Sequence, residues 1–361
     1  MIRSITFTLP GSGGKPVGGY KVVYEYANHL SRRGLQVAVV HPARLYAKGA
    51  PLKDWLRLLR YVPCLIDKGY RPDRWFGVES KVRVLWVPSL SQRYIPEADA
   101  VVATTWQTAE WVAAYKPEKG KKIYLVQDYE HFMTADDEIK ERIRRTFRSG
   151  LKTLCISPAV TSMVREAGGG VVAEIPNGLD FTIYFRSRSV DDRDRDMIGF
   201  PARSEKFKGM ADTLQALKKV IDSYPRMRVW AFGPRPVRGL PEWVCFYLRP
   251  SDNQLRELYN RTKIFVTASH YEGWGLPGAE AMACGAALVS TDHGGVRAYA
   301  SHGETALLSP AGEPEALAEN IFRLVQDEAL RIRIAEAGHD HIQEFTWGRA
   351  VNQFLTAINE S

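Results

Sequence analysis

The sequence is poor in cysteine, and its cysteines have none of the spacings typical of metal sites or disulfide frameworks. Among 361 residues there are four, all far apart in the chain: Cys64, Cys155, Cys245 and Cys284. Neither a C-x-x-C pair nor a short Cys-rich region occurs. A reducing cytoplasm is the natural setting for such a chain, and we expect no structural metal.

Long hydrophobic runs, targeting segments and nucleic-acid motifs are also missing. No stretch reaches the roughly 18 consecutive apolar residues of a transmembrane helix. Residues 1–9 alternate in polarity and form too short a segment for a secretory signal. Because zinc-finger spacings and RNP-type aromatic motifs are absent too, we expect a globular cytoplasmic protein without a nucleic-acid partner.

The charge is uneven along the chain. The formal net charge is +8, yet residues 1–180 contain 27 Lys and Arg against 18 Asp and Glu, whereas residues 181–361 contain 22 against 23. The positive excess therefore lies in the first half, which suits an acidic small molecule or an anionic membrane surface. The length itself suggests two domains.

One stretch combines a strand, a glycine-rich turn and a helix. Residues 264–267 are apolar and mostly β-branched, residues 273–278 contain three glycines and a proline, and helix-forming residues follow from Ala279. Such a turn presents free backbone N–H groups that favour a phosphate. We expect Glu272 before the turn and Glu280 inside the first turn of the helix, and their carboxylates suit hydroxyl groups. A sugar linked to a diphosphate meets both requirements.

The residues from Glu272 to Glu280, E-G-W-G-L-P-G-A-E, resemble the E-x7-E signature of the family four retaining glycosyltransferases. Arg203 and Lys208 are similar to the family's R-x4-K-G, and independently of the family a guanidinium and an ammonium after a strand can hold phosphate oxygens. The resemblance covers nearly the whole chain, closely over residues 199–350 and loosely over 40–150. It implies an α/β fold of two Rossmann-like domains facing across a cleft (GT-B).

The resemblance also implies a donor site and a division of roles. The catalytic candidates are Arg203, Lys208, Glu272 and Asp128. The donor-binding candidates are Gly18, Gly19, Arg203, Lys208, Glu272, Gly273, Gly275, Leu276 and Glu280. In this scheme the cations and the N–H groups at the glycine-rich turn neutralise a departing diphosphate, so neither metal nor cofactor is expected beside the nucleoside-diphosphate sugar, which is a co-substrate.

The acceptor side is less well specified. The expected strand over residues 122–126 runs into Gln127 and Asp128, where the family often has His-Asp. Asp128, Glu130 and His131 are acceptor-side candidates, and a purely structural role for them stays open. This stretch resembles a bacterial subgroup that includes rhamnosyltransferases of surface polysaccharides, which implies polysaccharide biosynthesis with a glycan or lipid-linked acceptor.

Residues 44–76 interrupt the α/β pattern with an amphipathic segment. Four apolar residues recur at helical spacing: Trp55, Leu58, Leu59 and Val62. Three cations fall on the opposite side of such a helix: Lys53, Arg57 and Arg60. We favour the interpretation in which the apolar side packs on the domain and the basic side is solvated. The alternative is peripheral contact with the inner face of an anionic membrane.

The expected domains are residues 1–180, an acceptor-side Rossmann-like domain that includes the C-terminal helix 345–361, and residues 181–344, the nucleotide-sugar domain. Residues 186–195 are densely charged, which predicts a mobile linker. Asp192 and Asp194 resemble the metal-binding pair of another glycosyltransferase fold, GT-A. A polar linker is the wrong setting for that site, so we reject them as metal ligands.

The function expected from these residues is retaining transfer of a sugar from a nucleoside-diphosphate sugar to a hydroxyl of a glycan, a lipid-linked molecule or a small molecule. Two alternatives remain open. A nucleotide-sugar 2-epimerase of the same fold would share the cleft without an acceptor, and a non-catalytic nucleotide- or carbohydrate-binding protein would bind the donor without turnover.

Overall fold

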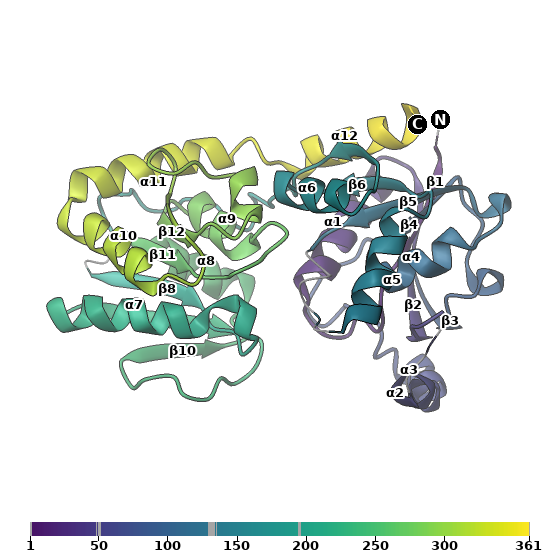
Figure 1. Ribbon diagram of the computed structural model, residues 1–361, viewed down its shortest axis with the longest axis horizontal. Helices are drawn as coiled ribbons and strands as arrows, with labels where there is room; N and C mark the ends of the chain where they lie inside the picture. The colour runs from purple at the N-terminus through teal and green to yellow at the C-terminus, as the bar shows by residue number, and fades with distance from the viewer. Residues whose placement is uncertain are drawn as a thin grey trace. The chain divides into compact units, whose positions relative to one another are not determined.

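The computed structural model describes residues 2–47, 49, 52–128, 134, 136–193 and 196–360. The chain divides into two compact units. Unit 1 comprises Met1–Asn177 together with Trp347–Ser361, and unit 2 comprises Gly178–Thr346. Each unit contains one parallel sheet with helices on both of its faces (Figure 1).

The sheet of unit 1 has seven strands in the order β3-β2-β1-β4-β5-β6-β7, and every pairing is parallel. Their bounds are β1 Ser4–Thr8, β2 Gln36–Arg44, β3 Arg83–Ser89, β4 Ala100–Ala103, β5 Lys121–Val126, β6 Lys152–Cys155 and β7 Val171–Glu174. The helices are α1 Gly18–Arg32, α2 Leu52–Leu56, α3 Tyr61–Asp67, α4 Trp106–Ala113, α5 Asp137–Phe147 and α6 Pro158–Glu166, with short 3-10 turns η1 Arg57–Arg60, η2 Gln92–Tyr94 and η3 Pro117–Lys119. The central strands are apolar because helices cover them on both sides.

The last helix of the chain, α12 (Trp347–Glu360), completes unit 1. The indole of Trp347 packs edge-on against Tyr26 at 5.3 Å between ring centroids, and Phe354 stacks on Phe7 at 6.2 Å. The Ile2 amide donates a hydrogen bond of 3.0 Å to Asn359 Oδ1, which brings the two ends of the chain side by side (Figure 1).

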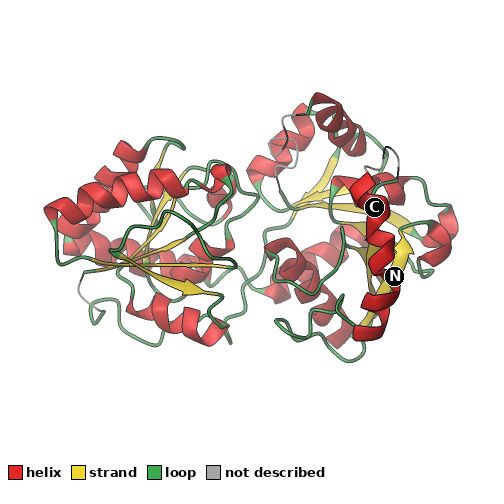
Figure 2. Ribbon diagram, turned by 90° about the horizontal axis from the view of Figure 1, so that it is seen from below, coloured by secondary structure: helices red, strands yellow, loops and turns green. Residues whose placement is uncertain are grey.

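The sheet of unit 2 has six parallel strands in the order β10-β9-β8-β11-β12-β13. Their bounds are β8 Met197–Pro201, β9 Arg228–Gly233, β10 Val244–Leu248, β11 Ile264–Thr267, β12 Ala287–Thr291 and β13 Leu307–Ser309. Figure 2 shows the strands between layers of helices. The helices of this unit are α7 Met210–Ser223, α8 Asp252–Arg261, α9 Leu276–Ala283, α10 Pro314–Gln326 and α11 Glu328–Ile342, with 3-10 turns η5 Lys206–Lys208 and η6 Gly295–Ala298.

The expected α/β class is confirmed, since both sheets are wholly parallel and their strands alternate with helices. Strand order reverses once in each unit, between β1 and β4 in unit 1 and between β8 and β11 in unit 2. In open parallel sheets the connections on the two sides of such a switch point diverge at the carboxyl ends of the strands, and ligands bind there. The fold therefore predicts a ligand site at one edge of each sheet, the edge formed by the carboxyl ends of the strands.

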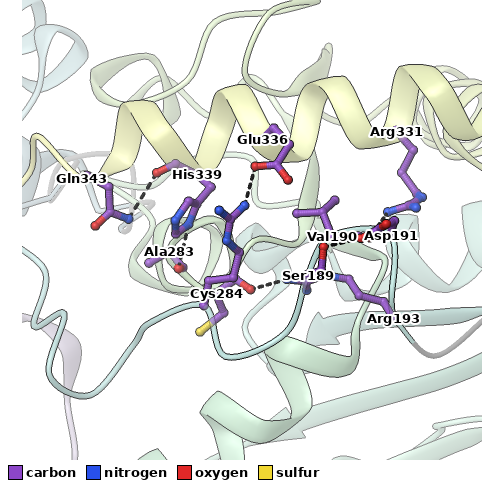
Figure 3. A network of polar contacts seen from close by, with 11 residues as sticks. Ser189, Val190, Asp191, Arg193, Ala283, Cys284, Arg331, Glu336, His339 and Gln343 are labelled. Carbon is purple, nitrogen blue, oxygen red and sulfur yellow. Dashed lines mark hydrogen bonds and ion pairs between the residues drawn. The ribbon is translucent and has the colours of Figure 1, made fainter.

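The charged segment from residue 186 was expected to be mobile, and for its described part this prediction is wrong. Residues 186–193 belong to unit 2 and pack against α9 and α11 (Figure 3). Arg186 pairs with Glu336 of α11, and Val190 lies in the hydrophobic core. Arg193 is buried and donates hydrogen bonds to the carbonyl oxygens of three residues: Tyr259, Thr262 and Cys284. Composition alone does not show that a charged side chain will be buried and donate hydrogen bonds to backbone carbonyl oxygens.

The amphipathic segment of residues 52–67 also departs from the favoured interpretation. It forms α2, η1 and α3 in succession, and Leu58 is half-buried, but most of its apolar side chains do not pack on the domain. Trp55, Leu59 and Val62 have 52%, 75% and 57% of their surface exposed. Figure 1 shows α2 and α3 at the periphery of unit 1, near β2 and β3. Among the described residues, no helix has both the length and the apolar character needed to cross a membrane.

The contacts of Arg193 predict that it stabilises unit 2. Replacing it in Arg193→Met removes three hydrogen bonds to buried carbonyl oxygens, which we expect to lower the free energy of unfolding by about 2–3 kcal/mol. Urea unfolding followed by tryptophan fluorescence measures the change, and exposed Arg226→Met is the matched control. Equal stability of the two variants would contradict an anchoring role for Arg193.

Candidate functional site

The candidate site of unit 2 lies at its switch point. The connection from β8 to α7 contains Arg203 and Lys208, and the connection from β11 to α9 contains Glu272 and Gly275. Since β8 and β11 are adjacent parallel strands, both connections leave from the same edge of the sheet. The topology thus brings together two predicted groups of residues that are more than sixty positions apart in the chain.

Lys208 and Glu272 form an ion pair that joins the two connections. Lys208 Nζ lies 3.1 Å from Glu272 Oε1, and the side chains are 23% and 19% exposed. Ser269 Oγ donates a 2.7 Å hydrogen bond to the same carboxylate oxygen. The predicted phosphate ligand and the predicted sugar ligand therefore contact one another directly, a pairing that the sequence did not indicate.

The backbones of the two connections also approach closely. Gly209 has φ +62°, and a Cβ there would lie 1.7 Å from the carbonyl oxygen of Ala268, so only glycine fits. The amide of His270 donates a 2.7 Å hydrogen bond to the Phe207 carbonyl, and its ring Nε2 lies 2.7 Å from Asp212 Oδ2 in the first turn of α7. Lys208 is consequently held on a rigid support. Arg203 lies half-buried on the same connection, just after β8.

The glycine-rich turn ends at the start of α9. Gly275 is the N-cap with φ +98°, a left-handed conformation that favours glycine, and Leu276 is the first helical residue. A Cβ on Gly275 would lie 3.0 Å from both His293 Cε1 and Tyr299 Oη. The site therefore has both of the features that favour an anion at a helix N-terminus, namely free N–H groups and the positive end of the helix dipole.

Glu280 lies deeper in unit 2 than we expected. The first turn of α9 contains no acidic residue, and Glu280 follows one turn further along, so its placement in the first turn is wrong. The side chain is only 6% exposed, and Tyr259 Oη donates a hydrogen bond of 3.4 Å to Glu280 Oε2. Both Glu272 and Glu280 add to the effect of burial in raising the pKa of the Tyr299 phenol, so both carboxylates lie near that ring.

The charges at this edge determine the protonation of its side chains. Burial alone raises the pKa of the Glu272 carboxyl, but Lys208, His293 and Ser269 Oγ outweigh burial and hold the pKa below its ordinary value. Burial lowers the pKa of His293, Lys208 lowers it further, and Glu272 opposes both. At neutral pH the carboxylate is therefore ionised and the imidazole is neutral.

Two residues of this region were missed by sequence reasoning. His293, just after β12, is 3% exposed, and its Nδ1 has no hydrogen-bond partner in the described part of the chain. Trp274 Nε1 is likewise buried without a partner among the described residues. Buried polar atoms are usually paired, so such groups next to Gly275 suit a bound ligand. The one signal in the sequence was that His293 follows the apolar residues 287–289 by a few positions and precedes two glycines.

In unit 1 the candidates lie at the edge that contains its own switch point. Gly18 and Gly19 are the first residues of α1, and a Cβ on Gly19 would lie 3.5 Å from Gln127 Oε1. Asp128 follows β5 and is half-buried. The structure therefore brings Gly19 close to the residue that precedes Asp128. The other acceptor-side candidates, Glu130 and His131, lie outside the described residues.

Metal ligands do not gather anywhere in the part of the chain that the structure describes: it contains no group of three or more His, Cys, Asp or Glu side chains placed to hold an ion. At the edge of unit 2, by contrast, two cations, Arg203 and Lys208, lie on the connection from β8 to α7. What the arrangement can do chemically is hold an anion beside a carboxylate that accepts hydrogen bonds.

Comparison with known proteins identifies the family of this region. Residues 184–341 match the family model described as glycosyl transferases group 1. The chain is 29% identical over 176 residues to a D-inositol 3-phosphate glycosyltransferase of Corynebacterium urealyticum, covering 44% of this chain and 42% of that protein. It is 28% identical over 216 residues to a phosphatidyl-myo-inositol mannosyltransferase of Mycobacterium tuberculosis, covering 55% of this chain and 57% of that protein.

Solved structures extend the likeness of the fold to the whole chain. The Anabaena protein Alr3699/HepE in complex with UDP-glucose has a TM-score of 0.74 at 19% identity, with 100% of both chains covered. Sucrose-phosphate synthase from Thermosynechococcus elongatus has a TM-score of 0.72 at 15% identity, covering 99% of this chain and 98% of that one. The resemblance to a glycosyltransferase family is confirmed over residues 184–341, and the GT-B fold class is confirmed, while the rhamnosyltransferase-like subgroup stays a prediction.

The ion pair of Lys208 and Glu272 predicts a pH-dependent contribution to stability. Because the native pKa of Glu272 is depressed, this contribution is present above the carboxyl's ordinary pKa and is lost as pH falls through the lowered native value. In a double-mutant cycle of Lys208→Met and Glu272→Gln we expect a coupling energy of about 1 kcal/mol at neutral pH. Urea unfolding at several pH values measures it. A coupling that stays constant down to strongly acidic pH would contradict the assignment.

Proposed function

Because this chain carries a glycosyl transferases group 1 domain over residues 184–341, we propose that it transfers a sugar from a nucleoside-diphosphate sugar to an acceptor hydroxyl. The observation that carries the proposal is the joining of Lys208 to Glu272 at the switch point of unit 2, beside the N-terminus of α9. This edge offers positive charge for a diphosphate and a carboxylate for hydroxyl groups within one small region.

The diphosphate would be held by cations and by backbone N–H groups. Lys208 supplies a point charge, and Arg203 on the same connection can present two parallel N–H donors to phosphate oxygens. The amides of Gly275 and Leu276 at the start of α9 add donors and the favourable end of the helix dipole. These groups are suited to stabilise the negative charge that develops on the leaving diphosphate, so we propose that transfer does not depend on a divalent metal.

The sugars of the donor would be held by the two carboxylates. Glu272 is ionised and already accepts a hydrogen bond from Ser269, so one of its oxygens can accept from a hydroxyl of the transferred sugar. Glu280 lies near the buried phenol of Tyr259 and would accept from ribose hydroxyls. The donor-binding candidates also include Gly273 and, at the edge of unit 1, Gly18 and Gly19, whereas Asp128 is proposed for the acceptor side.

Retention at the anomeric carbon completes the proposed mechanism. The acceptor oxygen attacks the anomeric carbon on the face from which the diphosphate departs, so the new glycosidic bond forms as the old bond breaks. The acceptor's proton passes to the departing phosphate oxygen, which gains negative charge as its bond to the sugar breaks. No protein nucleophile takes part, and the chain contributes orientation and charge stabilisation.

The acceptor is proposed only as a class. The names of the relatives point to inositol phosphates and phosphatidylinositol in those proteins, and the sequence resemblance implies a glycan or a lipid-linked molecule. A hydroxyl acceptor of the polyol or glycan type, either free or attached to a lipid, is consistent with all of these. Peripheral contact of the basic unit 1 with an anionic membrane belongs to the same proposal, because a lipid-linked acceptor is reached at a bilayer.

Donor binding should be visible without any acceptor. Ligands that bind the folded state alone raise its melting temperature, and at a concentration of 100 Kd the gain in stability is about 2.7 kcal/mol. We expect nucleoside diphosphates and their sugars to raise the melting temperature, and nucleosides without phosphate to have little effect. Thermal-shift measurement against a panel of bases and sugars tests this and also identifies the donor. Equal shifts for nucleosides and nucleoside diphosphates would count against a diphosphate site.

The cations should be essential for transfer. Lys208→Ala and Arg203→Ala each remove a group that stabilises the leaving diphosphate, and we expect turnover to fall by at least about a hundredfold. The matched control is Lys206→Ala, an exposed lysine of the same connection. The assay follows a radiolabelled donor sugar into a glycoside. Near wild-type turnover in both variants would refute these roles, and a labelled epimer with no glycoside would favour a 2-epimerase instead.

A further inference from the structure

Unit 1 presents a group of large apolar side chains to solvent on the segment of residues 52–67. The most exposed are Leu52, Leu59 and Ile66, at 74%, 75% and 78%. We call the whole group the exposed apolar face: Leu52, Trp55, Leu56, Leu59, Val62, Leu65 and Ile66. The other large apolar side chains exposed in the described chain are fewer and lie in several separate elements. Grouped apolar exposure of this kind marks an interaction site.

Hydrogen bonds attach this segment to the rest of unit 1. Its apolar side chains are therefore exposed although the segment itself is fixed in place. The buried Asp54 carboxylate accepts hydrogen bonds from the amides of Leu45 at 2.9 Å and Tyr46 at 3.0 Å. The indole of Trp86 in β3 donates a 3.0 Å hydrogen bond to the Tyr61 carbonyl. Polar and aromatic contacts thus attach the segment to β2 and β3, and most of its apolar side chains are left free for another surface.

The surroundings of the exposed apolar face are positively charged. Residues 44–75 contain eight Lys and Arg against three Asp. The three acids already have partners within the segment and its flanks: Asp54 is buried, Asp67 accepts from the Gly69 amide, and Asp73 pairs with Arg71. Arg57 lies 3.4 Å from Asp54 Oδ1 and still keeps half of its side chain exposed. A partner of this region must therefore offer apolar groups and negative charge together.

We propose that the exposed apolar face docks unit 1 onto the surface of an anionic lipid bilayer. An amphipathic helical segment with Leu and Trp on one side and cations nearby lies in the plane of the interface, with its apolar side chains among the acyl chains and its cations near the lipid phosphates. Trp55 suits the boundary between these layers, and the Arg44 guanidinium lies 4.1 Å from the centre of its ring.

A second copy of the chain is a poorer partner for this face. Two copies meeting through it would bring two clusters of like charge together, and the acids that could compensate are already engaged within each copy. A bilayer that contains anionic lipids supplies both apolar depth and negative charge without that repulsion. Docking itself does not depend on transfer chemistry. Its consequence, access to a lipid-linked acceptor, rests on the proposed function.

Vesicle flotation of the full chain tests the proposal. We expect the chain to float with vesicles of phosphatidylcholine and phosphatidylglycerol and to float weakly with phosphatidylcholine alone. The double variant Leu59→Ser/Ile66→Ser should lower the partition coefficient by at least about tenfold, because each lost side chain removes several methylene groups from the bilayer. The matched control Val172→Ser/Leu248→Ser removes two exposed apolar side chains elsewhere and should float like the wild type.

A charge variant and a salt series test the electrostatic part. Arg57→Gln should weaken flotation with anionic vesicles about fivefold, and added salt should weaken it further. Flotation that is absent, that is equal for neutral and anionic vesicles, or that survives Leu59→Ser/Ile66→Ser would overturn the proposal. A vesicle-free dimer that the double variant dissociates would overturn it in favour of self-association. Thermal shifts with nucleoside diphosphates, measured without vesicles, show whether the variants are folded and report on the donor site separately.

Discussion

The ion pair between Lys208 and Glu272 is the contact on which the interpretation of this protein depends. It joins the connection after β8 to the connection after β11, at the point where strand order reverses. Gly209 and Ala268 approach each other so closely that no side chain fits between them, and the His270 amide bonds to the Phe207 carbonyl. The cation is therefore positioned before any ligand arrives. Such preorganisation is what electrostatic stabilisation of a departing anion requires.

Positive charge at this edge is local. Residues 181–361 contain nearly equal numbers of acidic and basic residues, so no broad field draws an anion to unit 2. In the proposed function, the specificity of unit 2 for an anion comes from short-range donors, namely Lys208, Arg203 and the start of α9. Unit 1 differs, because most of the chain's excess positive charge lies there and some of it surrounds an exposed apolar face. The two proposals, short-range recognition of a small anion and broad attraction to an anionic surface, thus concern different parts of the chain.

Two interpretations of charged or amphipathic segments were wrong for related reasons. Residues 186–193 look like a solvated linker in composition, but Arg193 enters unit 2 and meets three backbone carbonyl oxygens. Residues 52–67 look like a helix packed by its apolar side, but that side faces solvent. Periodicity shows that a segment has two faces, and charge density shows that it is polar. Neither shows which surface each face meets, because that depends on distant parts of the chain.

The sequence by itself determined the α/β class, the likeness of residues 184–341 to a glycosyltransferase family, the glycine-rich turn before α9 and the choice of cations and carboxylates as site candidates, because local spacing and residue type carry that information. Only the tertiary structure decided that Lys208 contacts Glu272, that Glu280 lies beyond the first turn beside Tyr259, and that His293 reaches the same edge with an unpartnered nitrogen. These relations depend on how neighbouring strands align across the sheet. That alignment results from packing of the whole unit, and no local pattern in the sequence records it.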